Sequence, residues 1–317
     1  METPPRSGCA IVFPGMGPAD FAQTARFMLV NPYARRLLDT TDEVLGYPLF
    51  DRYQRAEGDY SEAAQVAFVV NCLALADWAR DRMETEPSYV AGPSFGGRAA
   101  AVFSGVLSLP DAILLTARLA RCMDEYFARE HPDLVTHSII RVPAEVRAQL
   151  LAELDERGDW YEISCELDHD FIMVTLDEAT LERLKPRITA LGGMSLYTMK
   201  PPMHASPFAP LRAQVERELF HGLTFADPAI PVVADQDGTV RETGAGVRDM
   251  LLDGFVRTVR WPAVLNTFKD LGVGRLYVSG QDGMFGRVPA ATRHFEVVPL
   301  TPAGATRPVR RKMPAVA

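Results

Sequence analysis

The stretch that most constrains the fold of this chain is residues 89–100, which read YVAGPSFGGRAA. A short apolar run enters a Gly-x-Ser-x-Gly pattern, and small residues that favour a helix follow it. This order is typical of a nucleophile elbow, a tight strand-to-helix turn that holds a serine in a strained backbone conformation. Gly92 and Gly96 carry no Cβ atom, so the strand and the helix can approach each other closely. The stretch therefore predicts an α/β fold with Ser94 as a candidate nucleophile.

Composition narrows the class of protein. With 317 residues, of which 47% are hydrophobic, the chain can form one large α/β domain or two smaller ones. Its net charge of −8 argues against nucleic acid as the main partner, because phosphate binding needs a basic face. No apolar run approaches the ~18 residues of a membrane span, and the first residues lack the apolar core of a signal peptide. We therefore expect a cytoplasmic protein with neither a nucleic-acid nor a membrane partner.

The spacing of cysteine and histidine gives no metal-binding pattern. The four cysteines are far apart and form no Cys-x-x-Cys pair, and the six histidines form no His-Glu-x-x-His-type cluster. We therefore expect reduced cysteines in the core and no metal site. The cysteines are Cys9, Cys72, Cys122 and Cys165.

The segments before and after the elbow alternate between strand and helix patterns. Residues 9–13 predict a short strand that ends in a glycine-rich turn. Helices are expected over 19–46, 61–80, 97–105 and 110–127. Gln65 lies in a strongly apolar part of the second helix, so its side chain needs a hydrogen-bond partner inside the protein.

The pattern changes near residue 130. The next segments predict strand, helix, strand, strand, helix and strand, which is the order of a ferredoxin-like unit. Their expected bounds are 137–142, 144–157, 160–167, 171–176, 178–191 and 194–199. We therefore predict a small ferredoxin-like subdomain over 131–199. It would be inserted into a large α/β-hydrolase-like subdomain with a parallel sheet, made of residues 1–130 and 200–317.

His204 follows the predicted insertion. It lies in the segment 200–207, where three prolines restrict the backbone, so we expect it in a loop rather than on a helix. Taken alone, such a histidine is better explained by an ordinary surface position. Further helices are expected over 211–220, to about 256 and to about 271, with extended segments at 230–235 and 275–279.

Six segments, taken together and in this order, resemble the acyl-carrier-protein transacylases. This family includes the malonyl transacylases of fatty-acid synthesis and the acyltransferases of polyketide assembly. The segments are 13–17 (FPGMG, family FPGQG), 64–67 (AQVA, family TQPA), 92–96 (GPSFG, family GHSxG), His204, 258–261 (TVRW, family PVRW) and 280–286 (family GPG loop). The ferredoxin-like insertion between the serine and the histidine is also the architecture of that family.

The resemblance implies the chemistry and the site. Ser94 would be the nucleophile and His204 its base, oriented by a main-chain carbonyl, in a ping-pong transfer through a Ser94 ester. The oxyanion hole would come from the main-chain N–H groups of Met16 and Phe95, and Gln65 would line the site. The acyl groups would be carried on the phosphopantetheine of acyl carrier proteins or on CoA, without a bound cofactor. The enzyme would be a monomer that acts in polyketide or antibiotic biosynthesis.

The departures from the family bear on the acyl group. The arginine that binds the free carboxylate in malonyl-specific members falls on Leu119, and an apolar residue cannot replace a guanidinium group. Arg118 and Arg121 flank this position at other helical angles. We therefore expect a non-malonyl acyl group, with the aminoacyl or dipeptidyl units of macrolactam pathways as the leading candidates. The other predicted pocket residues that depart from the family are Pro93, Gly97 and Met203.

Several alternatives stay open. The chain could be a malonyl transacylase, or an editing enzyme of the same fold that hydrolyses acyl groups from carrier proteins. An α/β-hydrolase is disfavoured because its histidine lies near the chain end, and a non-catalytic carrier-binding module because both Ser94 and His204 are present. The acidic run at 166–170 is either a solvated turn or a partner for an ammonium group. Candidates for a basic patch that would bind an acidic carrier protein are Arg141, Arg147, Arg287, Arg293 and the tail over 307–312.

Overall fold

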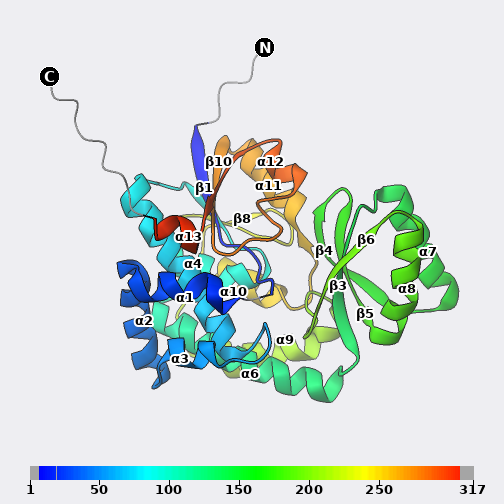
Figure 1. Cartoon of the computed structure of the whole chain (residues 1–317), viewed down its shortest axis with the longest axis horizontal. Helices are drawn as coiled ribbons and strands as arrows, with labels where there is room; N and C mark the ends of the chain where they lie inside the picture. The colour runs from blue at the N-terminus through cyan, green and yellow to red at the C-terminus, as the bar shows by residue number, and fades with distance from the viewer. Residues whose placement is uncertain (1–6, 19, 308–317) are drawn as a thin grey trace, which may run out of the picture.

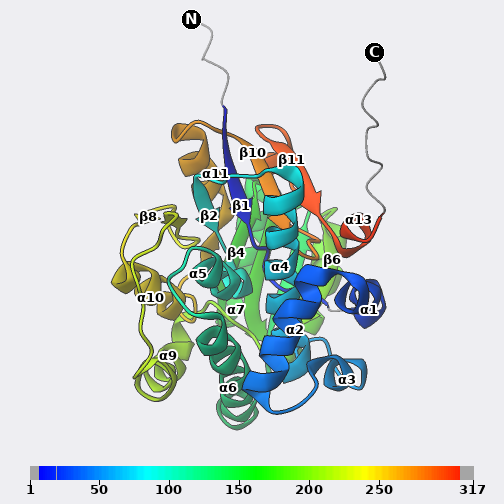
Figure 2. The same cartoon turned by 90° about the vertical axis from the view of Figure 1, so that its left-hand side faces the viewer.

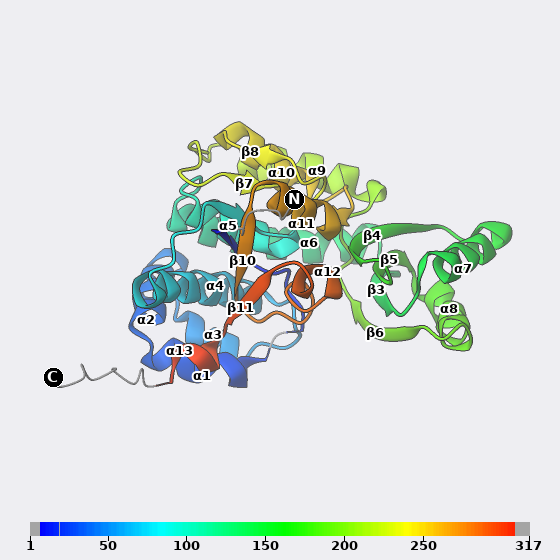
Figure 3. The same cartoon turned by 90° about the horizontal axis from the view of Figure 1, so that it is seen from above.

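The computed structural model describes residues 7–18 and 20–307, which form a large lobe and a small lobe (Figure 1). The small lobe, in green, lies at one side of the large lobe, and Figure 3 shows the same arrangement from above. Most of the basic tail predicted as a candidate docking segment, residues 308–312, lies outside the described residues.

The large lobe is built on a six-stranded sheet with the order β11-β10-β1-β2-β7-β8. Neighbouring strands run parallel except for β7 and β8, which are antiparallel. The predicted α/β class with a parallel sheet is thereby confirmed. The strands are β1 (Gly8–Val12), β2 (Tyr89–Ala91), β7 (Val232–Val233), β8 (Val240–Arg241), β10 (Val273–Ser279) and β11 (Glu296–Leu300).

Helices cover both faces of this sheet (Figure 2). In β1, Ile11 packs into the core cluster that contains α4 (Glu62–Met83), whereas Ala10 and Val12 pack into the cluster that contains α11 (Trp261–Asp270). This alternation is the period of two that a strand buried on both faces must have. The other helices of the α4 side are α1 (Phe21–Val30), α2 (Pro32–Leu45), α3 (Leu49–Gln54) and α5 (Gly97–Phe103).

The single helix predicted over 19–46 was wrong, because the structure has two helices there. α1 ends at Val30 and α2 begins at Pro32. Pro32 has no N–H group to donate to the preceding turn, so a helix cannot continue unbroken through it. Asn31 instead caps α2, since its side-chain oxygen accepts hydrogen bonds from the main-chain N–H groups of Tyr33 (3.0 Å) and Ala34 (3.3 Å).

The small lobe has the predicted order of elements. They are β3 (Leu134–Ile140), α7 (Ala144–Arg157), β4 (Tyr161–Asp168), β5 (Phe171–Asp177), α8 (Glu178–Ala190) and β6 (Met194–Met199). Their sheet order, β6-β3-β5-β4, is that of a ferredoxin-like unit, and both helices pack on one face. A fifth strand, β9 (Val259–Arg260), pairs parallel with β4 from outside the range 131–199.

Five more helices belong to the large lobe and the segment that leads into the small lobe. They are α6 (Leu109–Glu130), α9 (Ala209–Val215), α10 (Gly244–Asp253), α12 (Pro289–Thr292) and α13 (Pro302–Ala305). Within residues 7–18 and 20–307, none of the helices has the length and apolar content needed to cross a membrane. All four cysteines are free, and Cys72 and Cys165 are buried, whereas Cys9 and Cys122 are partly exposed.

Candidate active site

Ser94 follows β2 after two intervening residues, where the chain turns into a short 3₁₀ segment (Ser94–Gly96) and then into α5. Its φ angle is 54°, in the left-handed region that is costly for a residue with a Cβ atom. The turn depends on Gly96, because a Cβ atom there would lie 1.9 Å from the carbonyl oxygen of Phe13. The predicted elbow geometry, with its close strand-to-helix approach, is therefore present.

The hydroxyl of Ser94 faces His204. Ser94 Oγ lies 2.7 Å from His204 Nε2, although the two residues are 110 positions apart in the sequence. His204 sits in the loop between β6 and α9, as predicted, and it is only 5% exposed. Its φ angle is 63°, so both members of the pair have strained backbone.

The environment of His204 favours a neutral imidazole. Burial lowers the pKa of His204 to about 4, and the main-chain carbonyl groups of Gly254 and Arg257 oppose this shift. The Nδ1 atom of His204 is buried and has no hydrogen-bond partner among the described residues. A neutral imidazole can accept a proton at Nε2 from the serine hydroxyl, so the pair has the arrangement of a nucleophile and its base.

Asp235 is a site residue that the sequence analysis did not identify. It follows β7, the strand next to β2, and its Oδ2 atom accepts a hydrogen bond of 2.7 Å from the main-chain N–H of Ser94. Burial raises the pKa of Asp235 to about 6. Because parallel strands end at the same edge of a sheet, the acidic residue that ends the extended segment at 230–235 was a usable signal.

A pocket of about 80 Å³ opens beside this pair, and most of its wall is apolar. Of the predicted site residues, those that line it together with Ser94 and His204 are Met16, Gln65, Phe95, Gly97, Leu119 and Met203. Pro93 does not line the pocket: it precedes the elbow with a φ of −59°, and its carbonyl oxygen accepts the N–H of Gly96. The apolar wall comprises Leu115, Leu119, Met123, Phe220, Met250, Leu251 and Phe255.

Gln65 has the internal partner that its apolar helix requires. Its Nε2 atom donates a hydrogen bond of 2.7 Å to the carbonyl oxygen of Tyr60, and its Oε1 atom lies 3.5 Å from Arg98 Nη1. Arg98 also lines the pocket, and it is a second residue that the sequence analysis did not identify. Arg118 and Arg121 are exposed on α6, as predicted from their helical angles, and Arg121 lies 3.4 Å from Glu62.

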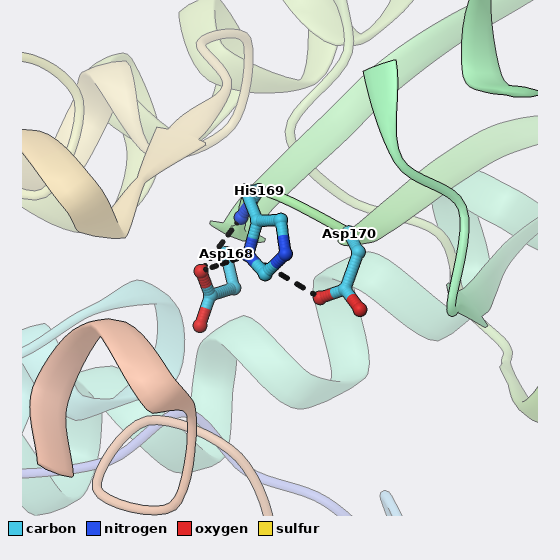
Figure 4. Close-up of side chains that lie close together, drawn as sticks. All are labelled: Asp168, His169 and Asp170. Carbon is cyan, nitrogen blue, oxygen red and sulfur yellow. Dashed lines mark hydrogen bonds and ion pairs between the residues drawn. The ribbon is translucent and has the colours of Figure 1, made fainter. Parts of the chain in front are cut away.

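The acidic run at 166–170 does not line this pocket. At the β4–β5 turn, Asp168 accepts hydrogen bonds from the main chain and the ring of His169, and Asp170 lies on the other side of that ring (Figure 4). The second oxygen of Asp168 accepts the N–H of Ala290 in α12 at 2.8 Å. Asp168 therefore fixes the β4–β5 turn to the large lobe, and the structure does not place this run where it could meet an ammonium group in the pocket.

The sequence is similar to known transacylases over most of its length. The malonyl CoA-acyl carrier protein transacylase of Bacillus subtilis is 23% identical over 286 residues, which are 85% of this chain and 88% of that protein. The corresponding Escherichia coli protein is 24% identical over 276 residues, 86% of this chain and 88% of that protein. A non-reducing polyketide synthase of Byssochlamys spectabilis is 31% identical over 156 residues, 49% of this chain and 7% of that protein.

Solved structures and a family model agree with these relatives. A malonyl-transacylase in complex with its type II polyketide-synthase acyl-carrier protein superposes with a TM-score of 0.81 at 22% identity, over 94% of this chain and 97% of that one. FabD from Acinetobacter baumannii superposes with a TM-score of 0.82 at 20% identity, over 94% and 95%. These structures show the shared fold. Residues 138–199 match the model of the VinK acyltransferase small domain. The chain is thus similar over most of its length to acyl-carrier-protein transacylases, and its small lobe is similar to the small domain of an acyltransferase.

Proposed function

We propose that the protein transfers an acyl group between carrier thioesters through an ester on Ser94. The observation that carries the proposal is the 2.7 Å contact between Ser94 Oγ and His204 Nε2 at the wall of an apolar pocket. Ser94 Oγ attacks the thioester carbonyl while His204 takes the hydroxyl proton. The carbon–sulfur bond then breaks, and His204 returns the proton to the leaving thiol. A second thiol attacks the Ser94 ester by the same steps in reverse.

The proposed oxyanion hole consists of the main-chain N–H groups of Met16 and Phe95. Both residues line the pocket with Ser94, which supports this assignment. Main-chain donors do not depend on side-chain identity, so methionine at position 16 can serve as well as the glutamine of the family. The carbonyl groups of Gly254 and Arg257 would stabilise the imidazolium that forms when His204 takes the proton.

The proposed carriers are acyl carrier proteins or CoA, which present the acyl group on a phosphopantetheine thiol. A transacylase of the same fold has been solved with its holo acyl-carrier protein, which supports this choice. Arg141, Arg287 and Arg293 are exposed, and no carboxylate of the described residues lies within ion-pair distance of any of them. They remain the candidates for binding an acidic carrier on this acidic protein.

We further propose that the acyl group is larger than malonyl and carries no free carboxylate on the α6 side of the pocket. Leu119 lies there, 3% exposed, among the leucine and methionine side chains of the wall. Aminoacyl and dipeptidyl groups are the proposed classes. The malonyl transacylase and the acyl-carrier editing hydrolase are the alternatives that an experiment must separate.

Incubation with a panel of donors tests this proposal. The protein is mixed with malonyl-, acetyl- and aminoacyl- or dipeptidyl-loaded carrier protein and weighed intact, and released acid is measured with and without an acceptor carrier. We expect the aminoacyl or dipeptidyl adduct to dominate and to disappear when the acceptor is added. A dominant malonyl adduct would make the protein a malonyl transacylase, and release of free acid in the presence of acceptor would make it an editing hydrolase.

Leu119→Arg is expected to shift the donor preference toward malonyl. A guanidinium at this position can bind the malonyl carboxylate through charge-assisted hydrogen bonds, so the ratio of malonyl to acetyl acylation rates should rise about 10- to 100-fold. Leu119→Met keeps the apolar character and volume and is the matched control. An unchanged ratio in Leu119→Arg would show that position 119 does not face the acyl group.

The rate of Ser94 acylation is expected to stay high well below neutral pH. Because the pKa of His204 is lowered to about 4, the neutral base is present above that value and is lost as the pH falls through it. The pKa of Asp235 is raised to about 6, so Asp235 gains a proton as the pH falls through 6, while His204 is still neutral.

Rapid-quench measurements from pH 4 to 9, with circular dichroism at each pH to detect unfolding, check this profile. Asp235→Asn removes the second titrating group and still offers an oxygen to the N–H of Ser94. In that variant the profile should show one step near pH 4. A single step near pH 6.5 would mean that His204 is solvated when it reacts.

A further inference from the structure

Arg98 lies one helical turn after Ser94. Both side chains line the acyl pocket. The guanidinium carbon lies over the Phe95 ring, 4.0 Å from its centre, in a cation–π contact. Nη1 lies 3.5 Å from Gln65 Oε1, a long hydrogen bond. The other N–H groups of Arg98 donate no hydrogen bond to any described residue.

The charge of Arg98 is not balanced by a neighbouring acid. Among residues 7–18 and 20–307, no carboxylate oxygen lies within 4.0 Å of it. Burial lowers the pKa of Arg98 to about 9, and no nearby negative charge opposes this shift, so the group is still protonated at neutral pH. Arg98 is partly buried, and a guanidinium whose donors are only partly hydrated is stabilised when a ligand supplies acceptor oxygens. An acceptor oxygen of a bound acyl chain would therefore stabilise the Arg98 guanidinium in the pocket beside Ser94.

The charge of Asp235 favours an uncharged acceptor oxygen on the acyl chain over a carboxylate oxygen. It lines the same pocket as Arg98, is not paired with it, and is ionised above about pH 6. The two opposite charges leave the pocket close to neutral before the acyl group enters. A carboxylate on the acyl chain would add a negative charge near Asp235, whereas an amide carbonyl offers Arg98 a strong acceptor without adding charge.

We propose that Arg98 is a specificity-determining residue whose guanidinium binds the carbonyl oxygen of an amide within the acyl chain. This inference rests on the proposed acyl transfer through Ser94. It assigns the recognition of the acyl group to the elbow helix α5 instead of α6, and it selects amide-bearing acyl groups over hydrocarbon chains of the same length. The apolar wall would contact the rest of the chain.

Three pantetheine thioesters of matched chain length test the assignment: N-acetylglycyl, pentanoyl and succinyl. The first places an amide carbonyl where the third places a carboxylate, and the second has only methylene groups there. The rate of Ser94 acylation is measured by intact mass for each donor. We expect wild type to prefer N-acetylglycyl over pentanoyl about 10- to 100-fold, the range for a hydrogen bond to a charged group. Succinyl should react more slowly than N-acetylglycyl.

Variants separate the role of Arg98 from general effects of the pocket. In Arg98→Met the preference for N-acetylglycyl over pentanoyl should fall to within about threefold of one, and Arg98→Lys should be intermediate because it keeps the charge without the planar fork. Arg118→Met makes the same substitution at an exposed position of α6 and should keep the wild-type ratio.

The outcomes are distinguishable. A wild-type ratio near one, or an Arg98→Met ratio equal to wild type, would overturn the assignment. A wild-type preference for succinyl that Arg98→Met abolishes would make Arg98 a carboxylate site and would also overturn it. If Arg98→Met does not fold, as judged by circular dichroism, Arg98→Lys decides, because a ratio equal to wild type in that variant would also overturn the assignment. Failure of wild type to form any Ser94 ester would instead refute the proposed function.

Discussion

Ser94→Ala is expected to abolish the acyl-enzyme and to slow acyl transfer about 10⁴-fold or more. No other group of the pair can form the ester, and removal of a nucleophile leaves only binding and oxyanion stabilisation. Intact mass spectrometry after incubation with an acyl donor should show no adduct. Transfer to an acceptor carrier, followed by the mass of that carrier, should fall to the background rate.

The backbone at position 94 requires a second variant. The φ of 54° is strained for alanine as for serine, and glycine adopts it freely. Ser94→Gly therefore removes the hydroxyl and relieves the backbone, and it should be as inactive as Ser94→Ala while unfolding at a temperature no lower than wild type. If either variant still forms a covalent adduct, the nucleophile is another residue.

His204→Asn is expected to lower the rate of Ser94 acylation by about 10²- to 10⁴-fold, the range for loss of a general base. Asparagine tolerates the φ of 63° at this position better than alanine, so the loop can keep its conformation. The acyl pocket should then remain intact, and the donor concentration for half-maximal rate should change little. Rapid-quench kinetics with a saturating donor measure the rate.

The pH profile of His204→Asn distinguishes the loss of the general base from a loss of structure. In His204→Asn the residual acylation should increase with pH up to the alkaline limit of the assay, because hydroxide must then take the serine proton. The acid step near pH 4 should be absent from that variant. A residual rate that keeps the wild-type pH profile would assign the base to another group.

Much of the site could be predicted because each principal residue lies in a local pattern. Ser94 lies in an elbow whose glycines are required by close backbone contacts, and His204 lies in a proline-rich loop that cannot form a helix. The ferredoxin-like order could be predicted because its strands and helices have clear periods of two and of 3.6 residues. The break at Pro32 was missed because apolar residues continue at helical spacing on both sides of it.

Residues that act through packing across the chain could not be assigned from local patterns. Asp235 contacts Ser94 across 141 positions, and only the pairing of β2 with β7 brings them together. Arg98 is close to the elbow in sequence, but the absence of an acidic partner within ion-pair distance is a property of the fold and of the described residues as a whole. Pro93 was predicted to line the pocket because it takes the place of the histidine in the family's GHSxG motif, but it does not line the pocket in the structure.

Because β4 pairs with β9, a segment exchanged between related transacylases must include more than the small lobe. Cys165 and Glu166 on β4 pair with Val259 and Arg260, which lie far beyond the end of the small lobe in sequence. A chimaera that replaces only 131–199 would join a foreign β4 to the resident β9, and a mismatch would leave an open sheet edge prone to aggregation. Engineering of acyl specificity by domain exchange should therefore move β9 and α11 together with the small lobe.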